Sequence, residues 1–254
     1  MLLCVDVGNT NIKFAIYNGD KQVLKTRFST DSKKTDDEFA VELYTIFQIN
    51  GFEPKSIKGS IISSVVPAVT ENLQKAIHKV TDCKPITLGP GVKTGLDLRI
   101  DNPATLGSDI VAMCVAVKEK YSCPAIVIGM GTATTIVYIN ENKSYCGGAI
   151  MPGVSISLDA LTNNGALLPS IELKATKKVI GTNTEDCIRS GIVLGTACSI
   201  DGMIELFREE TQTDPFIIAT GGLANTIAKN CKNDIIINDD LVLEGLISIY
   251  NRNN

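Results

Sequence analysis

Two short glycine turns of this sequence carry side chains suited to binding phosphate. The first, DVGNTN, comprises Asp6 to Asn11, and the second, GMGTATT, comprises Gly129 to Thr135. Glycine lets a backbone approach a ligand closely, and the N–H groups and threonine hydroxyls of such a turn can donate to phosphate oxygens. Asp6 adds a carboxylate that can hold hydrated Mg²⁺ against the same phosphates. A tight hairpin turn without a ligand is the alternative interpretation of either turn alone.

Two further glycine clusters lie in the second half of the chain. CGGAIMPGVSISLDAL contains Gly147 and Gly148, and IIATGGLANTIA contains Gly221 and Gly222. Such pairs suit an adenosine lying flat against backbone or an anion at a helix N-terminus, and they equally suit close packing between a strand and a helix. Neither a GxxxxGK[ST] loop nor a GxGxxG after the first strand is present, so the two commonest nucleotide folds are unsupported.

A carboxylate in NPATLGSDIVAM precedes a predicted helix. Asp109 in this segment has two interpretations. It can cap the N-terminus of the helix, or it can act as a general base that removes the proton from an alcohol as the alcohol attacks a phosphate.

Periodicity predicts alternating strands and helices around these motifs. Residues 2–7 and 12–17 read as a hairpin, residues 22–29 as a third strand and GSIISSVV as a fourth. Residues 38–48 and 68–80 show helical spacing of apolar side chains. This alternation indicates an α/β fold with a central mixed sheet.

The strand, turn, strand layout begins again at Ala125, after the glycine-rich and proline-rich segment Gly89 to Asp109 and a predicted helix over 110–120. We interpret this as an internal duplication. It predicts two similar domains around a cleft, 1–105 and 106–254, with ligands bound in the cleft.

Composition excludes several functional classes. With 254 residues, 44% hydrophobic residues and a net charge of -4, the chain has no basic surplus to attract nucleic acid or an anionic membrane. No signal peptide is recognisable at the start, so we expect a cytoplasmic protein. Eight cysteines without a CxxC pair and a single histidine, His78, predict reduced thiols and no zinc site.

The order of motifs resembles the type III pantothenate kinases, a family of the actin-like (ribonuclease H-like) kinase superfamily. The resemblance runs along nearly the whole chain through DVGNTN, GSIISSVVP, KTGL, DNP, LGSD, GTATT, YCGGAIMPG, NTEDCIRSGIVLG, ATGGLA and LVLEGL. It implies the duplicated fold of that superfamily and transfer of the γ-phosphate of ATP to the primary hydroxyl of pantothenate, the first step towards coenzyme A.

The resemblance also implies roles for individual residues. Asp109 would be the catalytic base, and Asp6 would hold Mg²⁺ through water. Contacts to ATP and its phosphates would come from Asp6, Gly8, Asn9, Thr10, Asn11, Lys13, Gly131, Thr132, Ala133, Thr134, Gly147, Gly148, Gly221 and Gly222. The substrate side would comprise Ile100, Gly107, Ser108, Asp109, Ile110 and Thr184 of the partner subunit in a homodimer.

Three positions depart from the family pattern. Gly129 stands where the family has an aspartate associated with a monovalent cation, K⁺ or NH₄⁺, so the loss of that cation site is predicted here. Ile110 replaces the arginine of G-x-D-R, and Ile100 replaces a tyrosine before D-N-P; an isoleucine donates no hydrogen bond to a carboxylate. Two alternatives therefore stay open. One is a catalytically impaired paralogue that acts as a ligand-binding or regulatory protein, and the other is a kinase for another small alcohol.

Overall fold

The chain folds into two compact units, each built on its own sheet. The computed structural model describes residues 1–165, 168–169, 171–174, 176 and 178–254. Unit 1 comprises Met1–Leu96, Asn102–Ala116 and Leu241–Asn254, and unit 2 comprises Asp97–Asp101 and Val117–Asp240. The observed grouping differs from the predicted division at residue 105, because residues 106–116 and the C-terminal helix lie with unit 1.

Unit 1 contains a five-stranded sheet with the order β3-β2-β1-β4-β5. β1 pairs antiparallel with β2 and parallel with β4. The strands are β1 (Leu2–Val7), β2 (Asn11–Asn18), β3 (Lys21–Ser29), β4 (Gly59–Ser64) and β5 (Ile86–Thr87). The helices are α1 (Asp36–Ile49), η1 (Pro54–Ser56), α2 (Pro67–Thr81), η2 (Pro103–Thr105), the part of α3 (Ser108–Lys120) up to Ala116, and α8 (Leu241–Asn253).

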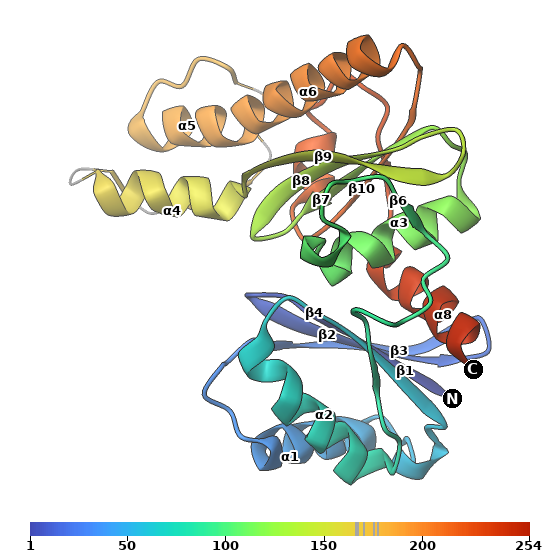
Figure 1. The fold of residues 1–254 in the computed structure, drawn as a ribbon. Helices are drawn as coiled ribbons and strands as arrows, with labels where there is room; N and C mark the ends of the chain where they lie inside the picture. Colours follow the sequence, from blue (N-terminus) through green and yellow to red (C-terminus); the bar gives the residue numbers. More distant parts are fainter. Residues whose placement is uncertain (166–167, 170, 175, 177) are drawn as a thin grey trace. The chain divides into compact units, whose positions relative to one another are not determined.

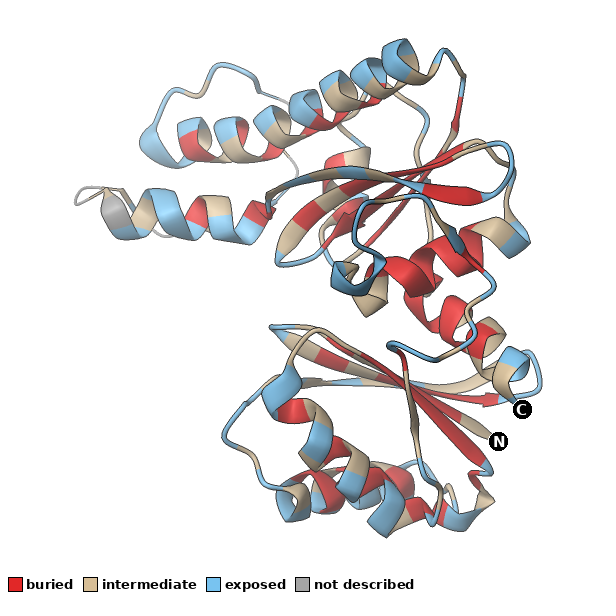
Figure 2. Cartoon of the chain, in the orientation of Figure 1, coloured by how far each residue is buried: buried red, intermediate tan, exposed pale blue. Residues whose placement is uncertain are grey.

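One face of this sheet is buried under α1 and α2 (Figure 2). Strand side chains alternate between two faces, so Leu3, Val5 and Val7 of β1 point to the same side and pack with apolar residues of both helices. α1 begins with a capping box formed by Thr35 and Glu38, which satisfies free backbone N–H groups at its first turn. Asp6 lies on the opposite face of the sheet, away from this core.

Unit 2 contains a six-stranded sheet with the order β11-β10-β7-β8-β9-β6. Its strands are β6 (Asp97–Leu98), β7 (Ala125–Met130), β8 (Ala133–Ile139), β9 (Ser144–Pro152), β10 (Phe216–Thr220) and β11 (Ile236–Ile237). Its helices are α4 (Val154–Asn164), α5 (Thr184–Arg189), η3 (Ser190–Leu194), α6 (Gly195–Thr211) and α7 (Ala224–Ala228). Side chains of α6, α7, η3 and α4 cover the face that carries Ile126 and Ile128.

The strand pairings confirm the predicted duplication. β7 pairs antiparallel with β8 and parallel with β10, as β1 does with β2 and β4. Asp6 pairs in register with Lys13, and Gly129 pairs with Thr135. β1 and β7 (Figure 1) are therefore equivalent strands. Asp6 and Gly129 occupy the same position, one residue before the end of each.

The helical run Thr184–Thr211 is the one helix in the described part of the chain that could span a membrane by length and composition. It has 28 residues, and the mean hydropathy of its most apolar 18-residue window is 1.3. A core helix of a soluble protein meets the same criterion, so this property alone does not indicate a membrane segment. The eight cysteines are free thiols, as predicted, and Cys146, Cys187 and Cys198 are exposed.

The C-terminal helix returns to unit 1, where it packs against β1 and β4. A Cβ added to Gly245 of α8 would lie 1.8 Å from the carbonyl oxygen of Ala112, and one added to Gly59 would meet the Tyr250 ring. Glycine at position 245 therefore permits a close approach of two backbones that a Cβ would prevent, whereas a Cβ at position 59 would require the Tyr250 side chain to move.

We predict that Gly245→Ala lowers the free energy of unfolding by about 1–3 kcal/mol, because the added methyl group overlaps backbone that cannot move aside cheaply. Gly202→Ala is the matched control, since Gly202 lies inside α6 with nothing within 4 Å of its added Cβ. There the better helix propensity of alanine should stabilise the protein by up to about 1 kcal/mol. Urea unfolding of both variants measures the difference, and an undiminished stability of Gly245→Ala would refute the close approach.

Candidate active site

Asp6 lies in a row of polar side chains that crosses the sheet of unit 1. In the strand register Asp6 is opposite Lys13 of β2 and beside Ser63 of β4, and Lys13 is in turn opposite Arg27 of β3. Residues paired in register share a face of the sheet. The order Arg27, Lys13, Asp6 and Ser63 therefore places two cations and one carboxylate on the face opposite the core.

The predicted phosphate turn follows directly from this row. The backbone N–H of Gly8 donates to the carbonyl of Asn11 at 3.0 Å, which closes the turn, while Asn9 and Thr10 are exposed. Thr30, after β3, donates its hydroxyl to the carbonyl of Gly8 at 2.6 Å, and its backbone N–H donates to the carbonyl of Thr10 at 2.9 Å. The turn is therefore held on both sides, and the exposed positions are left open for a ligand.

Asp109 is the second residue of α3 and belongs to the same unit. The interpretation of Asp109 as the N-cap is wrong, because the carbonyl of Gly107 already accepts a helical bond from Val111. The Asp109 carboxylate folds back over Gly107, where an added Cβ would lie 2.6 Å from Asp109 Oδ1. Glycine at position 107 therefore leaves room for the carboxylate.

Both carboxylates have raised pKa values. Burial raises the pKa of Asp6 from 3.8 to about 6, Lys13 lowers it, and the charge of Asp109 raises it further. Burial also raises the pKa of Asp109, against hydrogen bonds from the backbone of Ile110 and Asp109 that lower it. Raised pKa values are typical of groups that exchange protons or meet a cation in an active site.

Unit 2 presents the second predicted turn between β7 and β8. The backbone N–H of Gly131 donates to the carbonyl of Ala133 at 3.0 Å, and Gly131 and Thr132 are exposed. Thr134 is fully buried, and its hydroxyl has no hydrogen-bond partner in the protein. A buried hydroxyl without a partner is costly unless another group satisfies it. No part of Thr134 is accessible in this structure, so its contact with a nucleotide stays a prediction.

Two glycines let other segments approach this turn closely. A Cβ on Gly153 would lie 2.1 Å from the carbonyl oxygen of Thr132, and one on Gly221 would lie 2.2 Å from that of Met130. Gly221 also has a φ of +116°, which favours glycine. Gly222 follows and is exposed, with open space beside it. The strand end, the turn and the start of α4 are therefore packed backbone to backbone.

Backbone conformation and close packing explain why glycine occupies positions 147 and 148. Gly147 follows an irregularity in the pairing of β8 with β9 and has a φ of +114°. A Cβ on Gly148 would lie 2.2 Å from the carbonyl oxygen of Ile136. A Cβ on Gly147 would lie 3.9 Å from Ile100 Cγ2, so the predicted substrate residue Ile100 is its neighbour within unit 2. Their contact with a nucleotide stays a prediction.

The other residues predicted for the site differ in their exposure and in their neighbours. Ile110 is buried, and Thr184 is exposed as the first residue of α5. Gly129 has Thr135 and Thr220 as its register neighbours. The Ser108 hydroxyl bonds only to protein groups in unit 1, namely Ser63 and the backbone of Ser64.

Sequence reasoning missed several residues of the site. Ser63, Arg27 and Thr30 join it only through strand register and hydrogen bonds, and the sequence contains no local signal for them. Gly153 had a signal, because it directly follows Pro152 before a helix, as the turn chemistry of the segment indicates.

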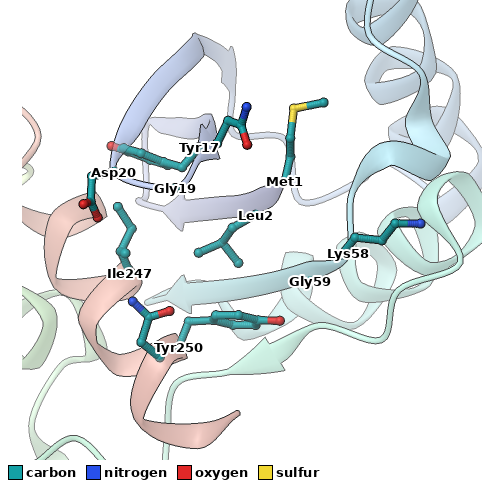
Figure 3. Close-up of a pocket in the computed structure, with 11 residues that line it drawn as sticks. Met1, Leu2, Tyr17, Gly19, Asp20, Lys58, Gly59, Ile247 and Tyr250 are labelled. Carbon is teal, nitrogen blue, oxygen red and sulfur yellow. The ribbon is translucent and has the colours of Figure 1, made fainter.

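A hollow of unit 1 lies elsewhere (Figure 3). Its volume is about 290 Å³, and Leu2, Tyr17, Gly59 and Tyr250 are among its lining residues. Leu2 is four residues before Asp6 on β1, a distance of roughly 13 Å along a strand. Among the described residues, no group of three or more His, Cys, Asp or Glu side chains is placed to hold a metal ion.

Comparison with known proteins identifies the relatives of this chain. Residues 2–206 match the family profile of type III pantothenate kinase. A type III pantothenate kinase of Halalkalibacterium halodurans is 41% identical over 253 residues, with 100% of each chain covered, and one of Geotalea uraniireducens is 40% identical, covering 100% of this chain and 99% of its own. A solved structure from Sinorhizobium meliloti, provisionally named a 2-dehydro-3-deoxygalactonokinase, has a TM-score of 0.65 at 13% identity, covering 99% of both chains. The last likeness confirms the predicted fold class.

The raised pKa of Asp6 predicts a pH-dependent effect of Asp6→Asn. The folded pKa, about 6, lies above the ordinary value of 3.8, so wild-type stability falls as the pH rises through about 6. At about 1.36 kcal/mol per pKa unit, Asp6→Asn should stabilise the protein at pH 8 by about 3 kcal/mol and have little effect at pH 3.5.

Unfolding in EDTA at the two pH values measures this effect. Asp20→Asn, on an exposed turn of unit 1, is the control and should change stability little at either pH. An equal effect of Asp6→Asn at both pH values would contradict the prediction.

A second prediction concerns the hydrogen bond by which Thr30 holds the first turn. Thr30→Val keeps the side-chain shape and removes the bond to Gly8. The loss of about 1 kcal/mol should weaken binding of Mg²⁺–ATP by about fivefold, as measured by calorimetry. Thr45→Val removes a hydroxyl bond on the exposed side of α1 and should leave the affinity unchanged. Equal affinities of wild type and Thr30→Val for Mg²⁺–ATP would show that the Thr30 hydrogen bond does not shape a nucleotide site.

Proposed function

The chain belongs to the type III pantothenate kinase family, and on this premise we propose that it transfers the γ-phosphate of ATP to the primary hydroxyl of pantothenate. The product is 4'-phosphopantothenate, and the reaction is the first step of coenzyme A biosynthesis. The observation that carries the proposal is the combination, within one compact unit, of a held glycine turn, the Asp6 row and Asp109.

Asp109 is assigned the role of general base. Its pKa is raised by burial, which makes its carboxylate a better proton acceptor than an ordinary aspartate. It accepts the proton of the substrate hydroxyl as that oxygen attacks the γ-phosphorus, while the bond from this phosphorus to the β,γ-bridging oxygen breaks and ADP leaves. Phosphoryl transfer depends mainly on positioning and on electrostatic stabilisation of the phosphate oxygens, so the base completes a site whose other residues bind and orient.

The first turn and its strand are assigned to the phosphates. The open positions Asn9 and Thr10 present backbone N–H groups and a hydroxyl, and Lys13 adds a positive charge beside Asp6. Asp6 fits a Mg²⁺ site, since its carboxylate is desolvated and lies within reach of the Asp109 charge. Mg²⁺ bound with ATP supplies positive charge that neutralises the phosphates. Gly131 and Thr132, which are exposed in the second turn, are assigned to the nucleotide on the same chemical grounds.

The assembly and setting of the enzyme belong to the same proposal. We assign it a homodimeric state, a cytoplasmic location and a Thr184 contribution to the site of the partner subunit. Exposed apolar side chains of unit 2 support a protein partner, among them Ile150, Val179 and Ile180, of which 75%, 74% and 83% is accessible. A monovalent cation held by a carboxylate at position 129 is not part of the proposal, because Gly129 has no side chain to ligate it.

A second candidate function follows from the departures near the site. Ile110, next to Asp109, is buried and apolar, and the two register neighbours of Gly129 are threonines. These residues favour either a kinase for a small alcohol other than pantothenate or an impaired paralogue that binds ligands without turnover.

A coupled assay with ATP, Mg²⁺ and pantothenate, with and without NH₄⁺, tests the function. We expect turnover by the wild type and a loss of at least about 100-fold in Asp109→Asn, the lower end of the range for loss of a general base. Asp101→Asn, an exposed aspartate outside the proposed machinery, is the control and should retain full turnover.

The same assay separates the alternatives. Turnover of another primary alcohol, and none of pantothenate, would replace the proposed substrate. ATP binding without turnover of any alcohol, together with a large gain in an Ile110→Arg, Gly129→Asp double variant, would establish the impaired paralogue.

A further inference from the structure

Three serines of unit 1 join the end of β4 to the start of α3. Ser63 and Ser64 are the last two residues of β4, and Ser108 is the first residue of α3. Ser63 and Ser64 lie more than forty positions before Ser108 in the sequence. None of the three serines belongs to the two glycine turns. Ser63 is completely buried, so water cannot replace a bond that its hydroxyl loses.

The Ser108 hydroxyl uses its full hydrogen-bonding capacity within this group. It donates to the carbonyl of Ser64 at 3.0 Å and accepts from the backbone N–H of Ser64 at 3.0 Å. Its oxygen is also 3.0 Å from Ser63 Oγ. A hydroxyl has one donor and two acceptor sites, so Ser63 is the donor in this last contact. Ser108 has no capacity left for a substrate.

The positions of the two serines connect both carboxylates of the site. Ser63 is the register neighbour of Asp6, and Ser108 immediately precedes Asp109. The bond between Ser63 and Ser108 therefore joins the strand pair that carries Asp6 to the helical turn that carries Asp109. Any shift of the helix start relative to β4 breaks three hydrogen bonds.

The group continues outward to α2 without touching Asp109. Ser64 Oγ accepts from the backbone N–H of Val66 at 3.1 Å and from the Thr70 hydroxyl at 2.7 Å. Thr70 thus bonds to the Ser64 side chain and makes no hydrogen bond to Ser108. A Thr70 variant is therefore a control that disturbs the Ser64 side chain and leaves the hydrogen bonds of Ser108 in place.

We propose that Ser63 and Ser108 are positioning residues that set the location of the Asp109 carboxylate relative to the Asp6 row. This inference rests on the proposed kinase function. A base must lie within hydrogen-bond reach of the proton that it accepts, and a displacement of about 1 Å can cost about 100-fold in rate. Loss of the hydrogen bonds that Ser108 makes to β4 is therefore expected to reduce kcat. The turn around Gly8, which is held by Thr30, should continue to bind ATP.

The test compares Ser108→Ala, Ser63→Ala, Ser108→Thr and Thr70→Val. We expect Ser108→Ala to lower kcat by at least about tenfold, with KM for ATP changed less than about twofold. Ser63→Ala should lower kcat less, because it removes one of three bonds. Ser108→Thr keeps the hydroxyl and should retain most of kcat, and Thr70→Val should match the wild type. An equal kcat in Ser108→Ala and Thr70→Val would overturn the inference.

Hydrogen exchange provides a readout that does not depend on turnover. Backbone amides of residues 108–112 should exchange faster in Ser108→Ala and Ser63→Ala than in wild type and Thr70→Val. Unchanged exchange in both alanine variants would overturn the positioning role. Absence of turnover in the wild type would instead contradict the proposed function, and the exchange result would still decide whether the serines hold the start of α3.

Discussion

The pairing of β1 with a strand on each side is the constraint on which the candidate active site depends. Leu3, Val5 and Val7 are buried against α1 and α2, and strand alternation then leaves Asp6 on the opposite face. A register slip of one residue would bury the Asp6 carboxylate in the apolar core and expose the apolar set. The hydrophobic face of the strand therefore determines the direction of the carboxylate, and the register with β2 and β4 brings Lys13 and Ser63 beside it.

The two units repeat this pairing and differ in charge. In unit 1 the repeated position holds Asp6, whose raised pKa reflects the free energy required to desolvate a carboxylate. Lys13 offsets part of that cost. In unit 2 the position holds Gly129 between two threonines, and the turn relies on backbone N–H groups and hydroxyls. The duplication thus preserves the backbone geometry of a turn, while the ionic chemistry is confined to unit 1.

Hydrogen bonds at the edges of the motifs complete the arrangement. Thr30 holds the carbonyl of Gly8, and the serines at the end of β4 hold the start of α3. These bonds connect segments that are remote in sequence. Each one restricts the conformational freedom of a loop or of a helix end. In a reaction in which catalysis is chiefly positioning, such supporting bonds matter as much as the groups that touch the substrate.

The amino-acid pattern alone was enough to predict the local elements and the chemistry that they carry. Hairpins, helices and glycine turns follow from the spacing of apolar side chains and from turn composition, and Asp6 and Gly129 were recognisable as equivalent positions. Three features emerged only from the folded chain: the C-terminal helix and the start of α3 belong with the first unit, Asp109 lies inside its helix, and Ser108 bonds to protein. They could not be predicted because periodicity reports only the burial of one face of an element. Close packing at Gly245 and the bonds between Ser63 and Ser108 depend on residues far apart in sequence, which meet only once the sheet has formed.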